Sequence, residues 1–253
     1  MNVEELIYTY GKYIYNYALR LSCHPSTAED LCQETFTKAW QKIDTLKNPN
    51  AIKAWLRKIC FNNFLVNERK KGNSVQRPFG DEIQELEKEG EFYINSYPRP
   101  EDQVIVRESV SEIQNGCFLA MVRYLTLNKR ITFSFIDMFG LSLQEVSQIL
   151  NISKGAVKGL LYRAHMNLDS FFQDHCSILD VENPCRCEAW IEFYSRRQTL
   201  QDKVQIVKTL NYKKSGYVFN KYTFNKIKYL YKNMPEKRPS DDWYQKIVDS
   251  LKN

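Results

Sequence analysis

Glycine, proline and histidine are scarce in this sequence, with 9, 8 and 3 residues among 253. So few turn-forming residues exclude collagen-like and low-complexity chains and argue against a turn-rich all-β fold. No apolar run approaches the ~20 residues that a membrane-spanning helix requires. The first residues, MNVEELIYTYGKY, also lack the basic start and the small-residue cleavage site of a secretory signal peptide. We therefore expect a cytoplasmic protein without a membrane segment of its own.

Charged residues are plentiful but unevenly distributed, and the net charge is +6. Residues 1–75 hold 11 basic and 7 acidic side chains, residues 118–173 hold 6 and 3, and residues 174–253 hold 15 and 10. Residues 76–117 reverse the balance, with 4 basic and 10 acidic side chains. An acidic segment thus separates basic blocks. This distribution favours contact with a polyanion, although a solvated lysine surface would have the same composition.

The hydrophobic pattern is helical almost throughout. Apolar residues over 28–40 recur at the spacing of one helix face, and Ser26 with Glu29 has the pattern of a capping box. A second helix is expected after residues 48–50 and should end near Gly72.

Residues 76–100 interrupt this pattern with prolines, glycine and a run of glutamates, which is typical of an extended linker. Helical periodicity then returns, and strand-like alternation is weak everywhere. We therefore predict an all-α fold with two small helical domains. The predicted parts are a helical domain over residues 1–75, an acidic linker over 76–100, a second helical domain over 101–173 and a mainly helical C-terminal extension over 174–253.

The clearest motif is SLQEVSQILNISKGAVKGLLYRAHMNL, residues 142–168. Ser142 and Glu145 form a capping box, and Asn151 suits a left-handed turn. Two helices joined by so short a turn, the second with a basic outer face, are typical of a helix-turn-helix, whose second helix enters the major groove of DNA. A helical hairpin with a solvated lysine face is the alternative. The residues expected to face DNA are Ser153, Lys154, Gly155, Lys158 and Arg163.

The chain resembles the bacterial RNA polymerase sigma factors of the extracytoplasmic-function (ECF) group. The segments that carry the resemblance are AEDLCQETFTKAW at 28–40, WLRKICFNNFLVNERKK at 55–71 and GLSLQEVSQILNISKGAVKGLLYRA at 140–164. With the linker, the resemblance covers about residues 1–173. It implies a subunit that binds core RNA polymerase and promoter DNA, as duplex and as melted single strand, and promotes strand opening. It implies no enzymatic activity and no required cofactor, and it allows an anti-sigma factor as a further partner.

The resemblance also assigns roles to single residues. Four residues of the first motif helix share the face opposite its apolar stripe and would bind the polymerase clamp helices, although a solvated face explains the pattern equally well. They are Asp30, Gln33, Glu34 and Thr37. The next helix, with the loop 44–50 before it, would capture the non-template strand of the minus-ten element. Its candidate residues are Lys53, Arg57, Lys58, Asn62, Asn63, Arg69 and Lys70. The helix-turn-helix would read the minus-thirty-five element.

The extension opens with one imidazole and three thiols that could form a tetrahedral, structural Zn²⁺ site. They are His175, Cys176, Cys185 and Cys187. The spacing is not that of a standard zinc finger, so a thiol redox switch and unligated cysteines stay open as alternatives. Residues 211–232 then interleave tyrosine, phenylalanine and lysine, which fits nucleic-acid binding or a helix packed through its rings. Ser240 should cap a last helix that contains Trp243, Ile247 and Leu251.

A second class of function fits the helix-turn-helix. An autonomous DNA-binding regulator, with a metal- or redox-responsive extension, would use this motif without binding RNA polymerase. The two hypotheses differ at the face that contains Asp30, which only a sigma factor needs. No catalytic triad, P-loop or zinc-hydrolase motif supports an enzyme.

Overall fold

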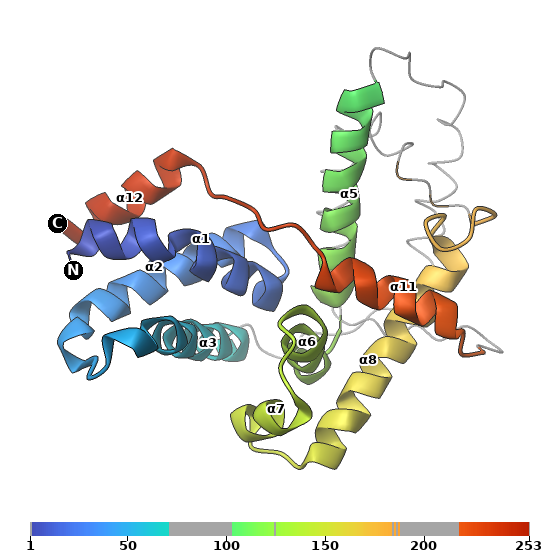
Figure 1. The fold of residues 1–253 in the computed structure, drawn as a ribbon, viewed down its shortest axis with the longest axis horizontal. Coiled ribbons are helices and arrows are strands. Elements are labelled where there is room, and N and C mark those ends of the chain that lie inside the picture. Colours follow the sequence, from blue (N-terminus) through green and yellow to red (C-terminus); the bar gives the residue numbers. More distant parts are fainter. Residues whose placement is uncertain are drawn as a thin grey trace. The chain divides into compact units, whose positions relative to one another are not determined.

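The structure is a computed structural model of the whole chain. It describes residues 2–70, 103–123, 125–183, 185, 187 and 218–252. The predicted acidic linker at 76–100 lies outside these ranges. The chain divides into two compact units, of which the first comprises Met1–Ser74 with Pro235–Asn253 and the second comprises Val75–Met234 (Figure 1). Each unit is described by itself.

The first unit is a bundle of four helices. They are α1 (Val3–Ser22), α2 (Pro25–Gln41), α3 (Ile52–Lys70) and α12 (Asp241–Lys252). The helices α1, α2 and α3 pack against one another through fully buried side chains, each of which contributes about 1.5–3 kcal/mol relative to an exposed position. The largest of these are Leu6, Ile7, Ile14, Leu21, Leu31, Phe36, Leu56 and Phe64.

The boundary between α1 and α2 follows from three consecutive residues. Cys23 ends α1 in the left-handed conformation, with φ of 55°, and its backbone N–H donates to the carbonyl of Leu19. His24 then caps α2, because its Nδ1 accepts a hydrogen bond from the N–H of Thr27 at 3.5 Å. Pro25 occupies the first helical position, where its missing N–H costs nothing. The predicted capping box at Ser26 is therefore wrong, since α2 begins one residue before Ser26.

The second unit contains the helix-turn-helix. Its described elements are α5 (Gln103–Arg123), α6 (Leu127–Phe133), the π-helix η4 (Ser134–Met138), α7 (Leu143–Leu150), α8 (Lys154–His175) and α11 (Lys221–Lys232). Its core is rich in aromatic rings. Among them Phe118 packs against Phe172 and Tyr231, with ring centroids 5.1 and 5.2 Å apart. Phe133 also meets Tyr231, at 4.9 Å.

A π-helical turn leads into the helix-turn-helix. The segment Ser134–Met138 continues α6 with the wider turn, and Gly140 follows with φ of +73°. A positive φ is the conformation that glycine adopts without strain, so Gly140 lets the chain turn sharply into α7. Figure 1 shows that α7 lies beside the amino-terminal end of α8, where the two helices contact each other.

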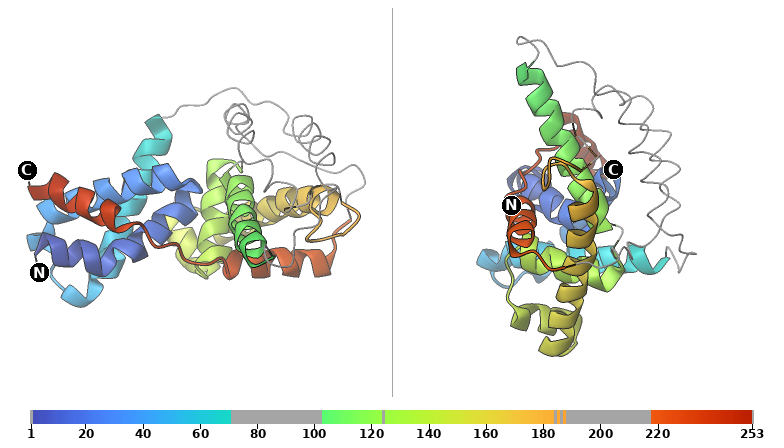
Figure 2. Two further views of the ribbon diagram at one scale, coloured as in Figure 1. Left: turned by 90° about the horizontal axis from the view of Figure 1, so that it is seen from above. Right: turned by 90° about the vertical axis from the view of Figure 1, so that its right-hand side faces the viewer.

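The C-terminal extension divides between the two units. The helix α11 packs on α8 and η4 in the second unit, whereas α12 packs on α1 and α2 in the first. Figure 2 shows α12 running alongside α1. Ser240 caps α12 as predicted, since its Oγ accepts from the N–H of Trp243 at 3.3 Å.

The described residues are helical apart from turns and one isolated β-bridge, between Cys176 and Cys185. The predicted all-α class is therefore confirmed. Within the described ranges, no helix combines the length and the apolar character that crossing a membrane demands.

Candidate functional site

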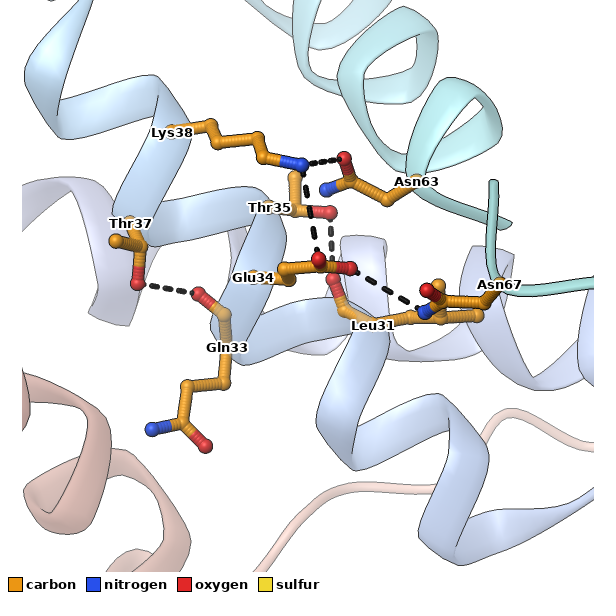
Figure 3. Close-up of polar contacts among 8 residues, drawn as sticks. All are labelled: Leu31, Gln33, Glu34, Thr35, Thr37, Lys38, Asn63 and Asn67. Atoms are coloured by element: carbon orange, nitrogen blue, oxygen red, sulfur yellow. Dashed lines mark hydrogen bonds and ion pairs between the residues drawn. The ribbon is translucent and has the colours of Figure 1, made fainter. Parts of the chain in front are cut away.

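The predicted polymerase-binding face is present on α2. Asp30 and Gln33 are exposed, and Glu34 and Thr37 are half-buried. Figure 3 shows Gln33, Glu34 and Thr37 on this helix. The hydroxyl of Thr37 donates to the carbonyl of Gln33 at 2.8 Å, one turn earlier in the helix. All four side chains stand on one side of α2, opposite the buried Leu31 and Phe36. This geometry leaves a carboxylate and an amide free to meet a partner.

Glu34 also connects α2 to α3. Its Oε2 accepts a hydrogen bond from the Asn67 side chain at 3.3 Å, and its Oε1 lies 3.6 Å from the ammonium of Lys38. The same ammonium donates to Oδ1 of Asn63 at 2.6 Å. Figure 3 shows this network, which holds the carboxylate of Glu34 in one place. The sequence analysis missed Lys38 and Asn67, although Lys38 stands at the i+4 position that pairs with a glutamate.

The basic side chains of α3 are mostly available to a ligand. Within the predicted set, Arg57 is half-buried and one asparagine is buried. The exposed members are Lys53, Lys58, Asn62, Arg69 and Lys70. The ammonium of Lys53 lies 5.4 Å from the ring centroid of Tyr13, which is a cation–π distance. The loop before α3 consists of two short 3-10 helices, Ile43–Thr45 and Pro49–Ala51, with the exposed residues Lys47 and Asn48 between them.

Asn63 does not belong with the exposed DNA-facing residues. Its side chain is 3% exposed and accepts the hydrogen bond from Lys38, so it contributes to the interior of the unit. The neighbouring Asn62 is exposed because it lies 100° further round the helix. The sequence could not separate these two asparagines, since the pattern of α3 is interrupted by polar residues on several sides.

The helix-turn-helix has the local geometry that its sequence predicts. Ser142 accepts from the N–H of Glu145 at 3.3 Å, and Oε2 of Glu145 accepts from the N–H of Ser142 at 2.8 Å, which completes the capping box. Asn151 ends α7 in the left-handed conformation, with φ of 53°. Ser153 caps α8 by accepting from the N–H of Ala156 at 3.1 Å. The predictions for the capping box and for Asn151 are confirmed, and together with the Ser153 cap these features set the amino-terminal end of α8 in a defined position.

The predicted DNA-facing residues of α8 are all exposed. They are Ser153, Lys154, Gly155, Lys158 and Arg163. Tyr162 lies on the same helix, is 62% exposed and was missed by the sequence analysis. Its spacing of four residues from Lys158 is the signal that could have identified it. Gly155 leaves open space, because a Cβ there would meet only the Ser153 hydroxyl, at 3.8 Å. A polyanion can therefore approach the backbone closely at this end of α8.

The opposite side of α8 is occupied by a buried charged cluster. His165 turns inward, where its Nε2 lies 2.6 Å from Oδ2 of Asp137, a fully buried carboxylate. Lys228 of α11 approaches the other oxygen of Asp137 at 3.7 Å. Asp169 lies nearby, and burial raises its pKa to about 7, with the neighbouring charge of His165 opposing this shift and that of Asp137 adding to it. The cluster therefore lies away from the exposed side of α8 that carries Lys154 and Lys158.

The four predicted zinc ligands do not assemble into a metal site. In the described part of the chain, no group of three or more His, Cys, Asp or Glu side chains could hold a metal ion. The segment is instead joined through its backbone, because the N–H of Cys185 donates to the carbonyl of His175 at 3.0 Å and the N–H of Ser177 donates to that of Cys185 at 3.1 Å. Asn183 closes the turn by donating to the carbonyl of Cys176 at 3.0 Å. All seven cysteines are thiols, not disulfides.

Comparison with known proteins gives a family match within each of the two units. The family model for Sigma-70 region 2 matches residues 6–72, and that for Sigma-70, region 4 matches residues 115–168. The first match contains the acidic face of α2 and the basic face of α3. The second contains the helix-turn-helix.

Three individual relatives are named as ECF RNA polymerase sigma factors. The ECF RNA polymerase sigma factor SigM of Bacillus subtilis is 26% identical over 68% of this chain and 96% of its own length. The factor SigW of the same organism is 29% identical over 67% of this chain and 88% of its own. SigE of Mycolicibacterium smegmatis is 25% identical over 69% of this chain, but the match spans only 63% of SigE. The chain belongs to the ECF group of RNA polymerase sigma factors.

Proposed function

We propose that the chain directs core RNA polymerase to promoters and that its two described units divide this work. The first unit binds polymerase through α2 and the melted minus-ten strand through α3. The second unit reads minus-thirty-five duplex through the helix-turn-helix. The factor acts in the cytoplasm, where polymerase and DNA are found, and it catalyses no reaction itself. The observation that carries the proposal is the presence of an acidic face and a basic face on adjacent helices, α2 and α3, of one small bundle.

The acidic face suits a basic partner surface. Asp30 and Gln33 are exposed, so binding a partner does not require them to leave the interior of the unit. Glu34 is already held by Lys38 and Asn67, so little side-chain entropy is lost when it is bound. Opposite charge on the polymerase would speed the encounter and define the register of docking more than it would add affinity.

The basic face suits a single DNA strand. Exposed cations along α3 can follow a phosphate backbone, and each phosphate contact releases counterions from the DNA. An unstacked base held by the protein offsets the few kcal/mol that unstacking costs. Strand opening can thus be driven by binding energy without nucleotide hydrolysis. The residues that the exposure pattern favours for backbone contact are the exposed cations Lys53, Lys58, Arg69 and Lys70.

The helix-turn-helix suits duplex DNA. The amino-terminal end of α8 offers backbone N–H groups and the positive end of the helix dipole, both of which favour a phosphate. Lys154 and Lys158 lie one turn apart on the exposed side, and Tyr162 follows one turn later. The missing side chain at Gly155 leaves room for the sugar-phosphate backbone.

The test is the affinity for core polymerase of a variant with Asp30→Ala and Glu34→Gln. Glutamine keeps an acceptor for Asn67, so the link between α2 and α3 is retained while the charge is lost. We expect at least about tenfold weaker binding, which corresponds to ~1.4 kcal/mol. The matched control is Glu5→Ala, which removes an exposed carboxylate from the start of α1. Equal affinity of the double variant and the control would refute polymerase binding through α2 and favour an autonomous DNA-binding regulator.

A further inference from the structure

The last helix of the chain is firmly docked on the first. Trp243, Tyr244, Ile247 and Val248 of α12 are all buried. Tyr244 stacks on Tyr8 with ring centroids 5.4 Å apart, and Trp243 meets Tyr15 edge-on at 5.8 Å. Aromatic pairs of this kind contribute about 0.5–1.5 kcal/mol beyond the burial of their area. The docking is therefore a specific contact between two helix faces.

Gly11 shapes the surface of α1 for this contact. A Cβ on Gly11 would lie 2.5 Å from Cε1 of Tyr244 and 3.4 Å from the ring of Trp243. Glycine in a helix interior costs about 0.5–1 kcal/mol relative to alanine. At this position the missing side chain lets the ring of Tyr244 pack closely on α1, so the surface of α1 is complementary to α12.

The chain just before α12 is also fixed to α1. The side-chain amide of Asn16 donates to the carbonyl of Lys237 at 2.8 Å, and the N–H of Lys237 donates back to Oδ1 of Asn16 at 2.9 Å. Asn16 is 5% exposed, so both of these bonds are shielded from water. Lys12 and Glu236 add an exposed ion pair at 3.1 Å. The anchorage of the first unit therefore begins at Glu236.

A few residues earlier, the same chain is fixed to the second unit. Tyr231 is fully buried, and its hydroxyl donates to the backbone carbonyl of Phe118 at 3.0 Å. Ile227 is buried on the same side of α11. The ammonium of Lys226 donates to the carbonyl of Ile178, which follows α8. The segment from Tyr231 to Lys237 thus connects an anchor on one unit to an anchor on the other.

This strap, Tyr231–Lys237, is short. Six Cα–Cα steps of about 3.8 Å allow at most about 23 Å between its anchors. The minus-ten and minus-thirty-five elements are centred ~25 base pairs apart, or about 85 Å of duplex at ~3.4 Å per base pair. Compact units of this size have radii of ~20 Å, so their facing surfaces would still be about 45 Å apart. The other connection, between Lys70 and Gln103, has a contour length of about 125 Å at the same step length and imposes no such limit.

We propose that the α12-binding face of α1, which includes Tyr8, Gly11 and Tyr15, is a reversible docking site, and that α12 leaves it when the factor engages both promoter elements. The proposal rests on the proposed division of work between the units. With α12 and α11 both docked, the strap is too short for simultaneous binding. The extension therefore restrains promoter binding until α12 is released. Polymerase binding is not restrained, because Asp30 and Gln33 remain exposed while α12 is docked.

The first test lengthens the strap without disturbing either helix. A thirty-residue Gly-Ser segment inserted between Pro235 and Glu236 leaves the contacts of α11 and α12 intact and adds ~30 Å of average reach. We expect holoenzyme with this variant to bind a fragment that holds both elements on the order of tenfold more tightly than wild type, because the binding-competent state is no longer rare. On a fragment with the minus-ten element alone, the two proteins should bind equally. Equal affinity on both fragments would overturn the proposal.

The second test measures the docking itself. Hydrogen exchange of the backbone amides of residues 241–252 reports whether α12 is docked, since a released helix of twelve residues is marginally stable. We expect these amides to exchange at least about tenfold faster in wild-type holoenzyme bound to the two-element fragment than in the free wild-type protein. The free Gly11→Leu variant, whose side chain would collide with Tyr244, should show the same fast exchange without DNA. Promoter binding with unchanged protection of α12 would contradict the inference and leave the proposed function intact. Absence of any promoter binding would contradict the proposed function itself.

Discussion

At the residue scale, Asp169 is a buried carboxyl group whose environment disfavours its charged form. It is 2% exposed, and its Oδ2 has no hydrogen-bond partner among the described residues. Burial raises its pKa from 3.8 to about 7. The folded protein therefore retains a proton that the unfolded chain releases, so the free energy of unfolding falls as the pH rises from about 4 to about 7 and is level above that.

This fall of the free energy of unfolding with rising pH gives a prediction for Asp169→Asn. The amide carries no charge to desolvate, so the variant should lose most of the pH dependence between pH 5 and pH 8. At pH 8 it should be more stable than wild type by on the order of 1–3 kcal/mol. Urea unfolding at the two pH values measures both effects. A variant less stable than wild type at pH 8, with the same pH dependence, would show that Asp169 is ionised at little cost in the folded state.

Two exposed lysines on α8 carry a second prediction at this scale. If Lys154 and Lys158 contact phosphates, replacing both with alanine should lower the slope of log affinity against log salt by about 2 for promoter binding by holoenzyme. Lys246→Ala is the control, because Lys246 is exposed on α12 and is not part of the helix-turn-helix. An unchanged salt slope in the double variant would mean that these lysines do not contact the DNA backbone.

The sequence was least informative about which individual side chains are buried. The spacing of Asp30 and Gln33 correctly placed them on an exposed face, because one face of α2 is strongly apolar. The same reasoning could not place Asn63, whose burial depends on a hydrogen bond from Lys38 of another helix. The inward position of His165 could not be foreseen either, since its partner Asp137 lies 28 residues earlier in the chain.

At the scale of elements, local capping chemistry decides how well the sequence predicts structure. The capping box of α7 lies within four residues, so its pattern and its geometry agree. The predicted start of α2 was wrong because serine is the commoner capping residue, so Ser26 was preferred to His24. In the structure His24 caps the helix and Pro25 is its first residue. The π-helical turn before α7 had no recognisable signal, since the wider turn is set by how its residues pack.

The capping box gives the element-scale prediction. Replacing Ser142 and Glu145 with alanine removes both hydrogen bonds that begin α7, and it should destabilise the second unit by about 1–2 kcal/mol. Urea unfolding of the variant and of a control measures this loss. Ser147→Ala is not a suitable control, because the Ser147 hydroxyl donates a hydrogen bond to the carbonyl of Ile152. Ala156→Ser, an exposed change in α8, is the better match. A loss no greater than that of Ala156→Ser would show that α7 does not need its cap.

At the scale of the whole molecule, the order of the two motifs predicted the fold class and the family, whereas the docking of the extension's last helix on α1 escaped prediction. Its Tyr244 packs on Gly11, more than 230 residues earlier, and no local pattern reveals contacts between such distant segments. Of the two alternatives for the basic-aromatic segment, packing through rings is the one that Tyr231 shows. It also leaves Tyr222 and Tyr229 exposed, at 71% and 66%, which the spacing alone did not distinguish.

The central claim is that both units act together with core RNA polymerase. Footprinting of a promoter fragment, with the chain alone and with the chain plus core polymerase, tests it most directly. We predict protection at both elements and reactive, unpaired thymines near the minus-ten element only when core polymerase is present, followed by run-off transcripts in proportion to the added chain. Full protection by the chain alone, with no strand opening when polymerase is added, would contradict the account.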